Sequence, residues 1–346
     1  MVQSGVLKTK NPFKVLLLLG FVIFLGSCES KPEQKSTTSK GSKTSSEAYK
    51  VKRPTFSSDS AYYFIQKQVD FGPRVPNTEA HLNAAKYLSE KLGSYGFNII
   101  EQKTRVTAFD DTKLSIINII GEYKAELNNR ILLFAHWDTR PFADQDKKRK
   151  AMPIDGANDG GSGVGVLLEV ARQINLLKPN IGIDIIFFDG EDYGQPSSDM
   201  RPQKSDSWGL GSQYWGKNLH KANYNANFGI LLDMVGAKDA IFAKERISRH
   251  YAPHIVDKVW SIASELGHGK HFVNQETNHV GVDDHLYVNQ LAKIPSIDII
   301  QYDPSTGAFA PHWHTHDDNM DIIDKATLQA VGETVLATII KESDSH

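Results

Sequence analysis

The chain of 346 residues contains a single cysteine, Cys28. One thiol cannot form an intramolecular disulfide, and a structural zinc site of the cysteine type needs several thiolates. The chain can therefore contain neither an intramolecular disulfide nor a structural zinc site built from cysteines. Hydrophobic residues make up 40% of the chain, which is enough for a sizeable core, so we expect a globular protein.

An excess of charge of one sign is also absent. The 39 Lys and Arg residues are balanced by 41 Asp and Glu residues, and the formal net charge is -2. Proteins that bind nucleic acid or an anionic surface usually carry a basic excess or a basic patch. We expect no nucleic-acid partner.

The N-terminal apolar run, "VLLLLGFVIFL" at residues 15–25, is too short for a membrane span. As a helix it would rise about 16 Å, roughly half the thickness of a hydrocarbon core. Lys8, Lys10 and Lys14 precede the run and small residues follow it. This arrangement is typical of a secretion signal.

The run ends in "LGSC" at residues 25–28, which resembles the lipobox of bacterial lipoproteins. In such proteins, cleavage before the cysteine leaves that residue to carry lipid. The resemblance implies a signal peptide at 1–27 and a lipid-modified Cys28 followed by a flexible tether to residue 55, rich in Ser, Thr and Lys. It also implies a location in the bacterial envelope, facing the periplasm or the cell exterior, with membrane contact only through this lipid.

From residue 56 to 346, helix-like and strand-like segments alternate without a second linker. The pattern predicts one α/β domain with a central, twisted, mixed and mostly parallel sheet and helices on both faces. The second helix is expected to begin at Asn77 or Thr78 and to end at Gly93 or Gly96. The predicted helices are 57–70, 77–96, 162–177 and 325–340, and the predicted buried strands are 114–123, 130–138, 182–192, 228–237 and 294–303.

Acidic residues and histidines gather where the predicted strands end or in nearby loops. An isolated acid at a strand end is more often a helix cap, but five segments of this chain share the feature. Crowded carboxylates repel one another unless a cation compensates them. Carboxylates and imidazoles without thiolate favour zinc with one open position. The residues are His136, Asp138, Asp159, Asp189, Glu191, Asp192, Asp233, Asp283, Asp284 and His285.

The ordered set of these residues, completed by His314 in "WHTHDDN", resembles the zinc aminopeptidase superfamily. The likeness covers most of the chain beyond residue 56. "FFDGED", "LLDMVGA", "VDDH" and "WHTHDDN" are closer to glutaminyl-peptide cyclotransferases of the animal type, which convert N-terminal glutamine into pyroglutamate and release ammonia. A long segment between the acidic pair and "GLGS" also distinguishes the chain from the usual aminopeptidase pattern.

The resemblance implies a role for each of the matching residues. Zinc is assigned to Asp159, Asp192 and His314, and proton transfer to Glu191. Asp233 and Asp283 would support the catalytic residue by hydrogen bonds. Trp313 and Phe309 match positions of the substrate pocket, and Trp208 is a further candidate for its apolar wall. The family generally has Glu where this chain has Asp192.

Three functional hypotheses remain open at this point. The first is a monomeric, one-zinc glutaminyl cyclase that acts on peptides or proteins with N-terminal Gln. The second is a two-zinc aminopeptidase, in which His136 and Asp233, together with Asp159, hold the second ion. The third is a binding module that has lost its metals, and the intact set of acidic residues and histidines argues against it. His312 and His316 are expected to lie off the metal.

Overall fold

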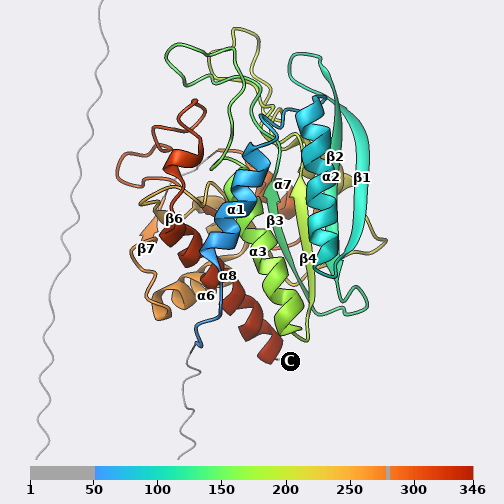
Figure 1. Cartoon of the computed structure of the whole chain (residues 1–346), viewed down its shortest axis with the longest axis vertical. Helices are drawn as coiled ribbons and strands as arrows, with labels where there is room; N and C mark the ends of the chain where they lie inside the picture. Colours follow the sequence, from blue (N-terminus) through green and yellow to red (C-terminus); the bar gives the residue numbers. More distant parts are fainter. Residues whose placement is uncertain (1–50, 278–280, 346) are drawn as a thin grey trace, which may run out of the picture. The chain divides into compact units, whose positions relative to one another are not determined.

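The computed structural model describes residues 51–277 and 281–345 (Figure 1). The predicted signal peptide, Cys28 and nearly all of the predicted tether lie outside these residues. Within them, no helix combines the length and the apolar character that a membrane crossing requires.

A six-stranded sheet forms the centre of the domain, in the order β1-β2-β4-β3-β5-β8. β3 runs parallel to β4 and β5, and β5 runs parallel to β8, whereas β2 is antiparallel to β1 and β4. The predicted mixed sheet is therefore confirmed. Its strands are β1 (Asn98–Thr107), β2 (Lys113–Tyr123), β3 (Arg130–His136), β4 (Gly182–Phe188), β5 (Gly229–Asp233) and β8 (Ser296–Ile300). A separate parallel pair consists of β6 (Phe242–Lys244) and β7 (Phe272–Glu276).

Helices cover both faces of the sheet, as the alternation along β3 shows. Leu133 belongs to the larger core cluster, and Phe134 belongs to a second cluster that also contains Trp215. Successive side chains of a strand point to opposite faces, so both faces are buried. The first face carries α1 (Ser58–Val69), α2 (Glu79–Ser94), α3 (Gly161–Leu177), α6 (Pro253–Glu265) and α8 (Lys325–Asp344); α4 (Leu210–Lys217), α7 (Asp284–Tyr287) and the π-helix η1 (Val288–Ala292) lie on the second.

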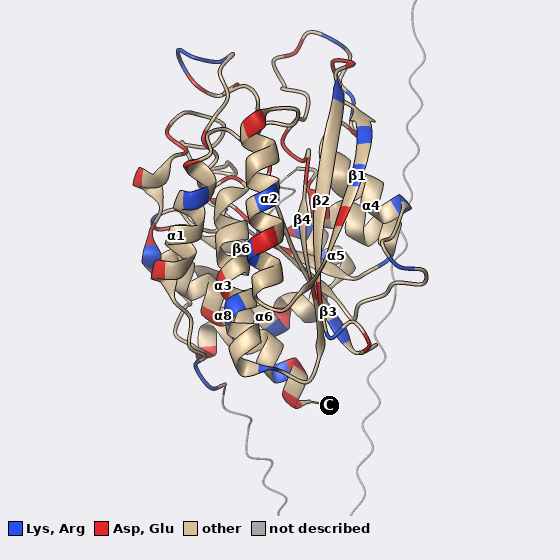
Figure 2. Cartoon of the chain, turned by 45° about the vertical axis from the view of Figure 1, so that its right-hand side comes forward, with Lys and Arg blue, Asp and Glu red and all other residues tan. Residues whose placement is uncertain are grey.

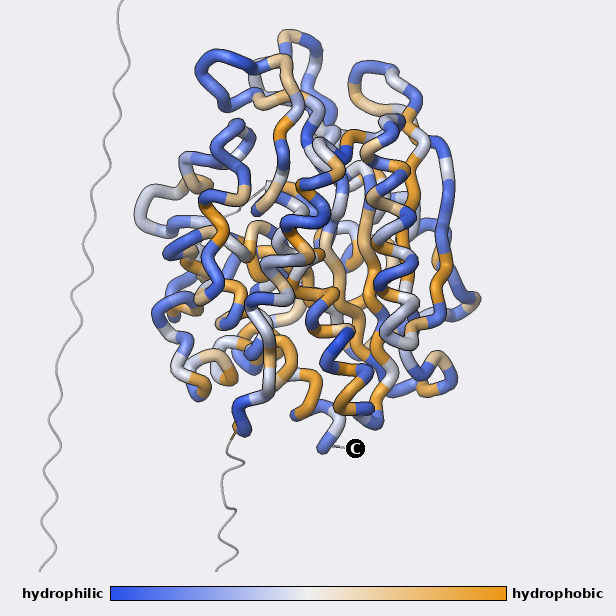
Figure 3. The backbone as a smooth tube through the Cα atoms, viewed as in Figure 1, coloured by the Kyte–Doolittle hydropathy of each residue, from blue (hydrophilic) through white to orange (hydrophobic). Residues whose placement is uncertain are grey.

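Hydrophobic residues are concentrated along the central strands (Figure 3). Lys, Arg, Asp and Glu are spread over the outer helices and the loops (Figure 2). The short helix α5 (Arg246–Tyr251) packs against β8.

α3 is more deeply buried than its sequence predicts. The pattern indicated one apolar face, but nearly all of its first four turns are buried because α1 and α8 lie against it. The close approach depends on small residues: a Cβ added to Gly165 would lie 2.5 Å from the side chain of Ile65 in α1. At its far end, Leu177 lines a groove together with residues 52–55 and Ile340.

The boundaries of other elements follow local signals. The side chain of Thr78 accepts a hydrogen bond from the backbone N–H of His81 and caps α2, which ends at Ser94 just before Gly96 with φ of +85°. β1 was not predicted, because at the edge of the sheet its residues are exposed or half-buried and polar residues dominate its outer half. The predicted strands also end earlier than expected, at His136, Phe188, Asp233 and Ile300.

Candidate metal centre and substrate pocket

The carboxyl ends of the four parallel strands lie at one edge of the sheet. His136 is the last residue of β3, and Asp233 is the last residue of β5. Asp159 reaches the same edge from the loop before α3. That loop requires glycine, because Gly160 has φ of +77° and an added Cβ would lie 2.9 Å from the His136 ring. The strand order and the tight turn together bring the predicted residues to one place.

The predicted zinc ligands Asp159, Asp192 and His314 form one donor group. The Nε2 atom of His314 lies 3.3 Å from Asp192 Oδ1 and 3.7 Å from Asp159 Oδ2. Ligand atoms of tetrahedral zinc, at bond lengths of about 2.0 Å, lie roughly 3.3 Å apart. Within the described residues, Asp159 Oδ2 and Asp192 Oδ2 are buried acceptors without a hydrogen bond. The three residues therefore fit a zinc ion.

His136, Asp159 and Asp233 form a second donor group that shares Asp159 with the first. The Nε2 atom of His136 lies 3.0 Å from Asp159 Oδ1 and 3.2 Å from Asp233 Oδ1. Burial opposes a charged imidazole, but hydrogen bonds to Asp138, Asp159 and Asp233 raise the pKa of His136 well above its usual value. These carboxylates therefore favour the protonated form of His136 when no metal is bound.

A third buried group consists of Asp283, which lines the pocket, together with His285 and Asp298. Asp298 was not predicted, although a lone Asp within the apolar strand "PSIDII" is a signal. Burial and the nearby Asp283 raise the pKa of Asp298 well above its usual value and that of Asp284 to about 8. Burial and the charge of Asp283 thus favour the protonated forms of Asp298 and Asp284.

Glu191, the predicted proton shuttle, is buried and lines the same pocket as the first donor group. Burial raises its pKa well above the usual value, and the negative charges of Asp283 and Asp284 act in the same direction. A carboxyl group with a raised pKa can both accept and release a proton near neutral pH. The environment of Glu191 thus suits acid and base chemistry.

Two buried carboxylates hold the loops that carry the ligands. Asp138 accepts the backbone N–H groups of Glu191 and Asp192 at 3.0 and 3.2 Å. Asp318 accepts those of Asn158 and Asp159 at 2.7 and 3.0 Å. Neither role is visible in the sequence pattern, because each joins segments that are distant along the chain.

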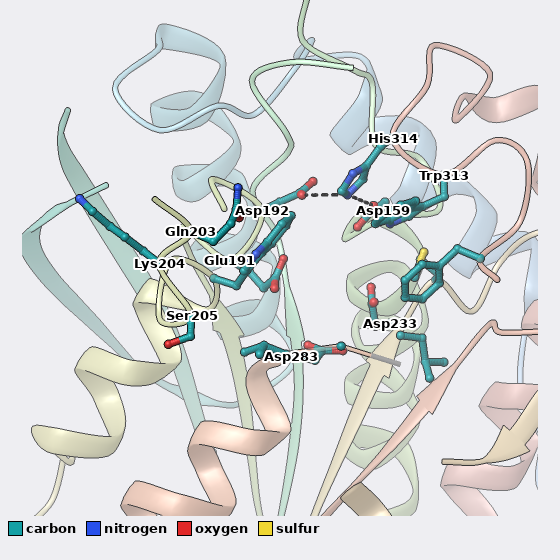
Figure 4. A pocket seen from close by; sticks show the side chains of 16 residues that line it. Asp159, Glu191, Asp192, Gln203, Lys204, Ser205, Asp233, Asp283, Trp313 and His314 are labelled. Atoms are coloured by element: carbon teal, nitrogen blue, oxygen red, sulfur yellow. Dashed lines mark ion pairs between the residues drawn. The ribbon is translucent and has the colours of Figure 1, made fainter. Parts of the chain in front are cut away.

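The pocket has a volume of about 400 Å³ and places carboxylates opposite aromatic rings (Figure 4). All three predicted aromatic residues, Trp208, Phe309 and Trp313, line it. The His314 ring stacks on Trp313 at 3.7 Å and on Trp208 at 5.9 Å between centroids. The acidic residues and the histidine that line the pocket are Asp159, Glu191, Asp192, Asp233, Asp283 and His314, and its other polar residues are Gln203, Lys204 and Ser205.

The other histidines of "PHWHTHDDN" belong to neither donor group. The Nε2 atom of His312 lies 3.4 Å from the side-chain nitrogen of Asn158, and the Nδ1 atom of His316 lies 2.8 Å from Asp146 Oδ2. Trp215 packs in the core against Phe188. His312, His316 and Trp215 therefore contact other side chains of the protein and contribute no atom to a donor group.

The fold and the site are those of a zinc-dependent α/β enzyme of the aminopeptidase type. The chain belongs to peptidase family M28, whose family model matches residues 118–339. The predicted resemblance to this superfamily and to its cyclotransferases is therefore confirmed.

Two solved structures with different names are similar to the chain. Glutaminyl cyclase of Bacteroides thetaiotaomicron, bound to N-acetylhistamine, is 53% identical, with a TM-score of 0.81 over 84% of this chain and 99% of that chain. A leucine aminopeptidase precursor from the same species is 52% identical, with a TM-score of 0.81 and the same coverage.

Curated relatives divide in the same way. The glutaminyl-peptide cyclotransferase of Drosophila melanogaster is 22% identical over 74% of this chain and 73% of that protein. Aminopeptidase YwaD of Bacillus subtilis is 27% identical over 69% of this chain, which spans only 47% of that protein. The names alone do not decide between the two activities.

The buried carboxyl groups predict how the stability of the metal-free protein depends on pH. Burial raises the pKa of Asp233 to about 7 and that of Asp318 to about 8. The folded state binds protons that the unfolded state has released above about pH 4, so the free energy of unfolding should fall from about pH 5 to about pH 8 and level off above that. Urea unfolding at pH 5 and at pH 8 measures the change. Zinc-saturated protein, as the control, should show a smaller change, and a rise in the metal-free protein would contradict the prediction.

Proposed function

We propose that the protein is a glutaminyl-peptide cyclotransferase that converts the N-terminal glutamine of peptides or proteins into pyroglutamate and releases ammonia. The observation that carries the proposal is the group of three buried carboxyl side chains, Glu191, Asp233 and Asp283, that line one pocket opposite the donor group of His314 (Figure 4). The similarity to solved glutaminyl cyclases at 53% identity supports it.

Cyclisation makes different demands from hydrolysis. The α-amine of the substrate attacks its own γ-carbonyl carbon, so a five-membered ring forms within one molecule and no water is consumed. Peptide hydrolysis instead needs an activated water, which commonly calls for metal ions. A site with one cation and a mobile proton is sufficient for the first reaction.

Glu191 is the group that moves the proton. A bond forms between the α-nitrogen and the γ-carbon, the bond from that carbon to the amide nitrogen breaks, and Glu191 carries a proton from the first nitrogen to the departing ammonia. Asp283 contributes to the raised pKa of Glu191 and thereby eases both transfers.

Asp159, Asp192 and His314 would hold one zinc ion beside Glu191. Bound zinc supplies a Lewis acid that polarises the γ-amide oxygen and offsets the charge that develops on it. The aromatic wall of Trp208, Phe309 and Trp313 excludes water from the reacting amide and so disfavours hydrolysis.

The second candidate is a two-zinc aminopeptidase. The donor group of His136, Asp159 and Asp233 favours it, as does the similarity to an aminopeptidase precursor.

The mass of the product distinguishes the two activities. We expect a peptide that begins with Gln to lose the mass of one ammonia molecule and to keep all its residues. A peptide that begins with Asn is the control, since its shorter side chain would have to close a four-membered ring. Release of a free amino acid from either peptide would support the aminopeptidase and refute the cyclase.

Substitutions distinguish the role of Glu191 in proton transfer from the role of His314 in zinc binding. Glu191→Gln removes the proton carrier but no ligand, so turnover should fall by roughly 10²- to 10⁴-fold while zinc remains bound. His314→Ala should lose zinc. Initial rates and zinc content by mass spectrometry measure both effects. A Glu191→Gln variant with normal turnover would show that another group carries the proton.

We also propose that the mature protein is a monomer anchored in the bacterial envelope by lipid on Cys28. The lipobox-like "LGSC" at residues 25–28 supports the anchor. Cys28→Ser should move the protein from the membrane fraction to the soluble fraction of expressing bacteria. Retention of this variant in the membrane would refute the lipid anchor.

A further inference from the structure

Two charged residues behind the first donor group have no role in the reaction described above. Arg140 and Asp144 are both buried, and both lie in the loop that follows β3. The guanidinium Nε of Arg140 donates to Asp144 Oδ1 at 2.5 Å. The same oxygen of Asp144 lies 3.1 Å from the Nδ1 atom of His314.

Asp144 faces the side of the His314 ring that points away from the other ligands. Nε2 of His314 lies near Asp159 and Asp192, whereas Nδ1 faces Asp144. A carboxylate next to one ring nitrogen keeps the proton on that nitrogen and leaves the lone pair of the other free for a metal. The position of Asp144 therefore favours the tautomer of His314 that a metal ligand needs, although Nδ1 makes no hydrogen bond within the described residues.

Arg140 connects Asp144 to the second ligand. Its Nη1 donates to the backbone carbonyl of Asp192 at 2.9 Å and lies 3.4 Å from Asp192 Oδ1. Its guanidinium carbon lies 4.7 Å from the ring centroid of Trp208, which itself stacks on His314. One buried cation thus contacts a ligand, the partner of another ligand and the pocket wall.

These contacts also explain the unusual Asp192. Aspartate is one methylene shorter than glutamate, so its backbone must lie closer to the metal. Asp138 holds the N–H of Asp192 and Arg140 holds its carbonyl. The residue is fixed from both sides.

We propose that Arg140 and Asp144 are positioning residues of the metal centre: Asp144 orients His314 toward the metal, and Arg140 holds Asp144 and Asp192 in place. The inference rests on the proposed zinc centre of Asp159, Asp192 and His314 but not on which reaction follows. Both residues act through the ligands.

The same loop provides a matched control. Asp146, two residues after Asp144, contacts His316, two residues after His314, at 2.8 Å. This second pair has the same chemistry and the same spacing, but neither partner belongs to a donor group. Asp146→Ala removes a contact of the same type from the same two segments, together with the hydrogen bonds that Asp146 accepts from the backbone N–H groups of Lys148 and Arg149.

The test measures zinc affinity by competition with a chromophoric chelator. Asp144→Ala should weaken zinc binding by roughly 10- to 100-fold and change the absorption spectrum of the cobalt-substituted protein, whereas Asp146→Ala should change neither. Asp144→Asn, which keeps the shape and removes the charge, gives the same comparison if the alanine variant does not fold. Equal zinc affinity in wild type and in a folded Asp144 variant would overturn the proposal, as would an equal loss in Asp146→Ala.

Arg140 is tested by partial rescue. Arg140→Met should weaken zinc binding, and Arg140→Lys should restore part of the loss, because lysine keeps the charge but cannot contact Asp144 and Asp192 with a planar fork. Equal affinities of both variants and wild type would refute the role of Arg140. These measurements need no turnover. If the wild type does not cyclise Gln peptides but Asp144→Ala binds zinc more weakly than the wild type, only the proposed reaction is refuted.

Discussion

The concentration of buried carboxyl groups at one edge of the sheet is the constraint on which the rest of the structure depends. Asp159 belongs to two donor groups, and Asp192, Asp233 and Glu191 line the same pocket. Buried carboxylates repel one another unless cations or protons compensate them. A metal fits between Asp159, Asp192 and His314. In the second group the carboxylates favour a protonated His136, and in the third group burial favours a protonated Asp298.

A crowded site of this kind also needs a rigid backbone. Asp138 and Asp318 each fix two successive N–H groups of a ligand loop, and Arg140 fixes the carbonyl of Asp192. Such hydrogen bonds set the positions of the ligands before any ion or substrate binds, which lowers the cost of ordering them. The short Asp192 side chain is compatible with the site because its backbone is held on both sides.

The sequence predicts every strand of the main sheet except β1, because buried strands leave unbroken apolar runs and a half-exposed edge strand does not. It also predicts the residues that the structure brings together around the pocket, since motifs and strand ends mark them. The sequence does not indicate the roles of Asp298, Arg140 and Asp144, or the hydrogen bonds by which Asp318 holds the loop of Asp159. Their partners lie far along the chain or in loops without periodicity, so only the folded structure shows the pairs.

The long burial of α3 has a consequence for where the chain enters the domain. The helix begins at Gly161, close to Asp159 in sequence, and its 17 residues end at Leu177, next to residues 52–55. Its length of roughly 25 Å separates the point where the chain enters the domain from the pocket. Residues 52–55 therefore lie at the end of α3 that is remote from Asp159 and from the pocket.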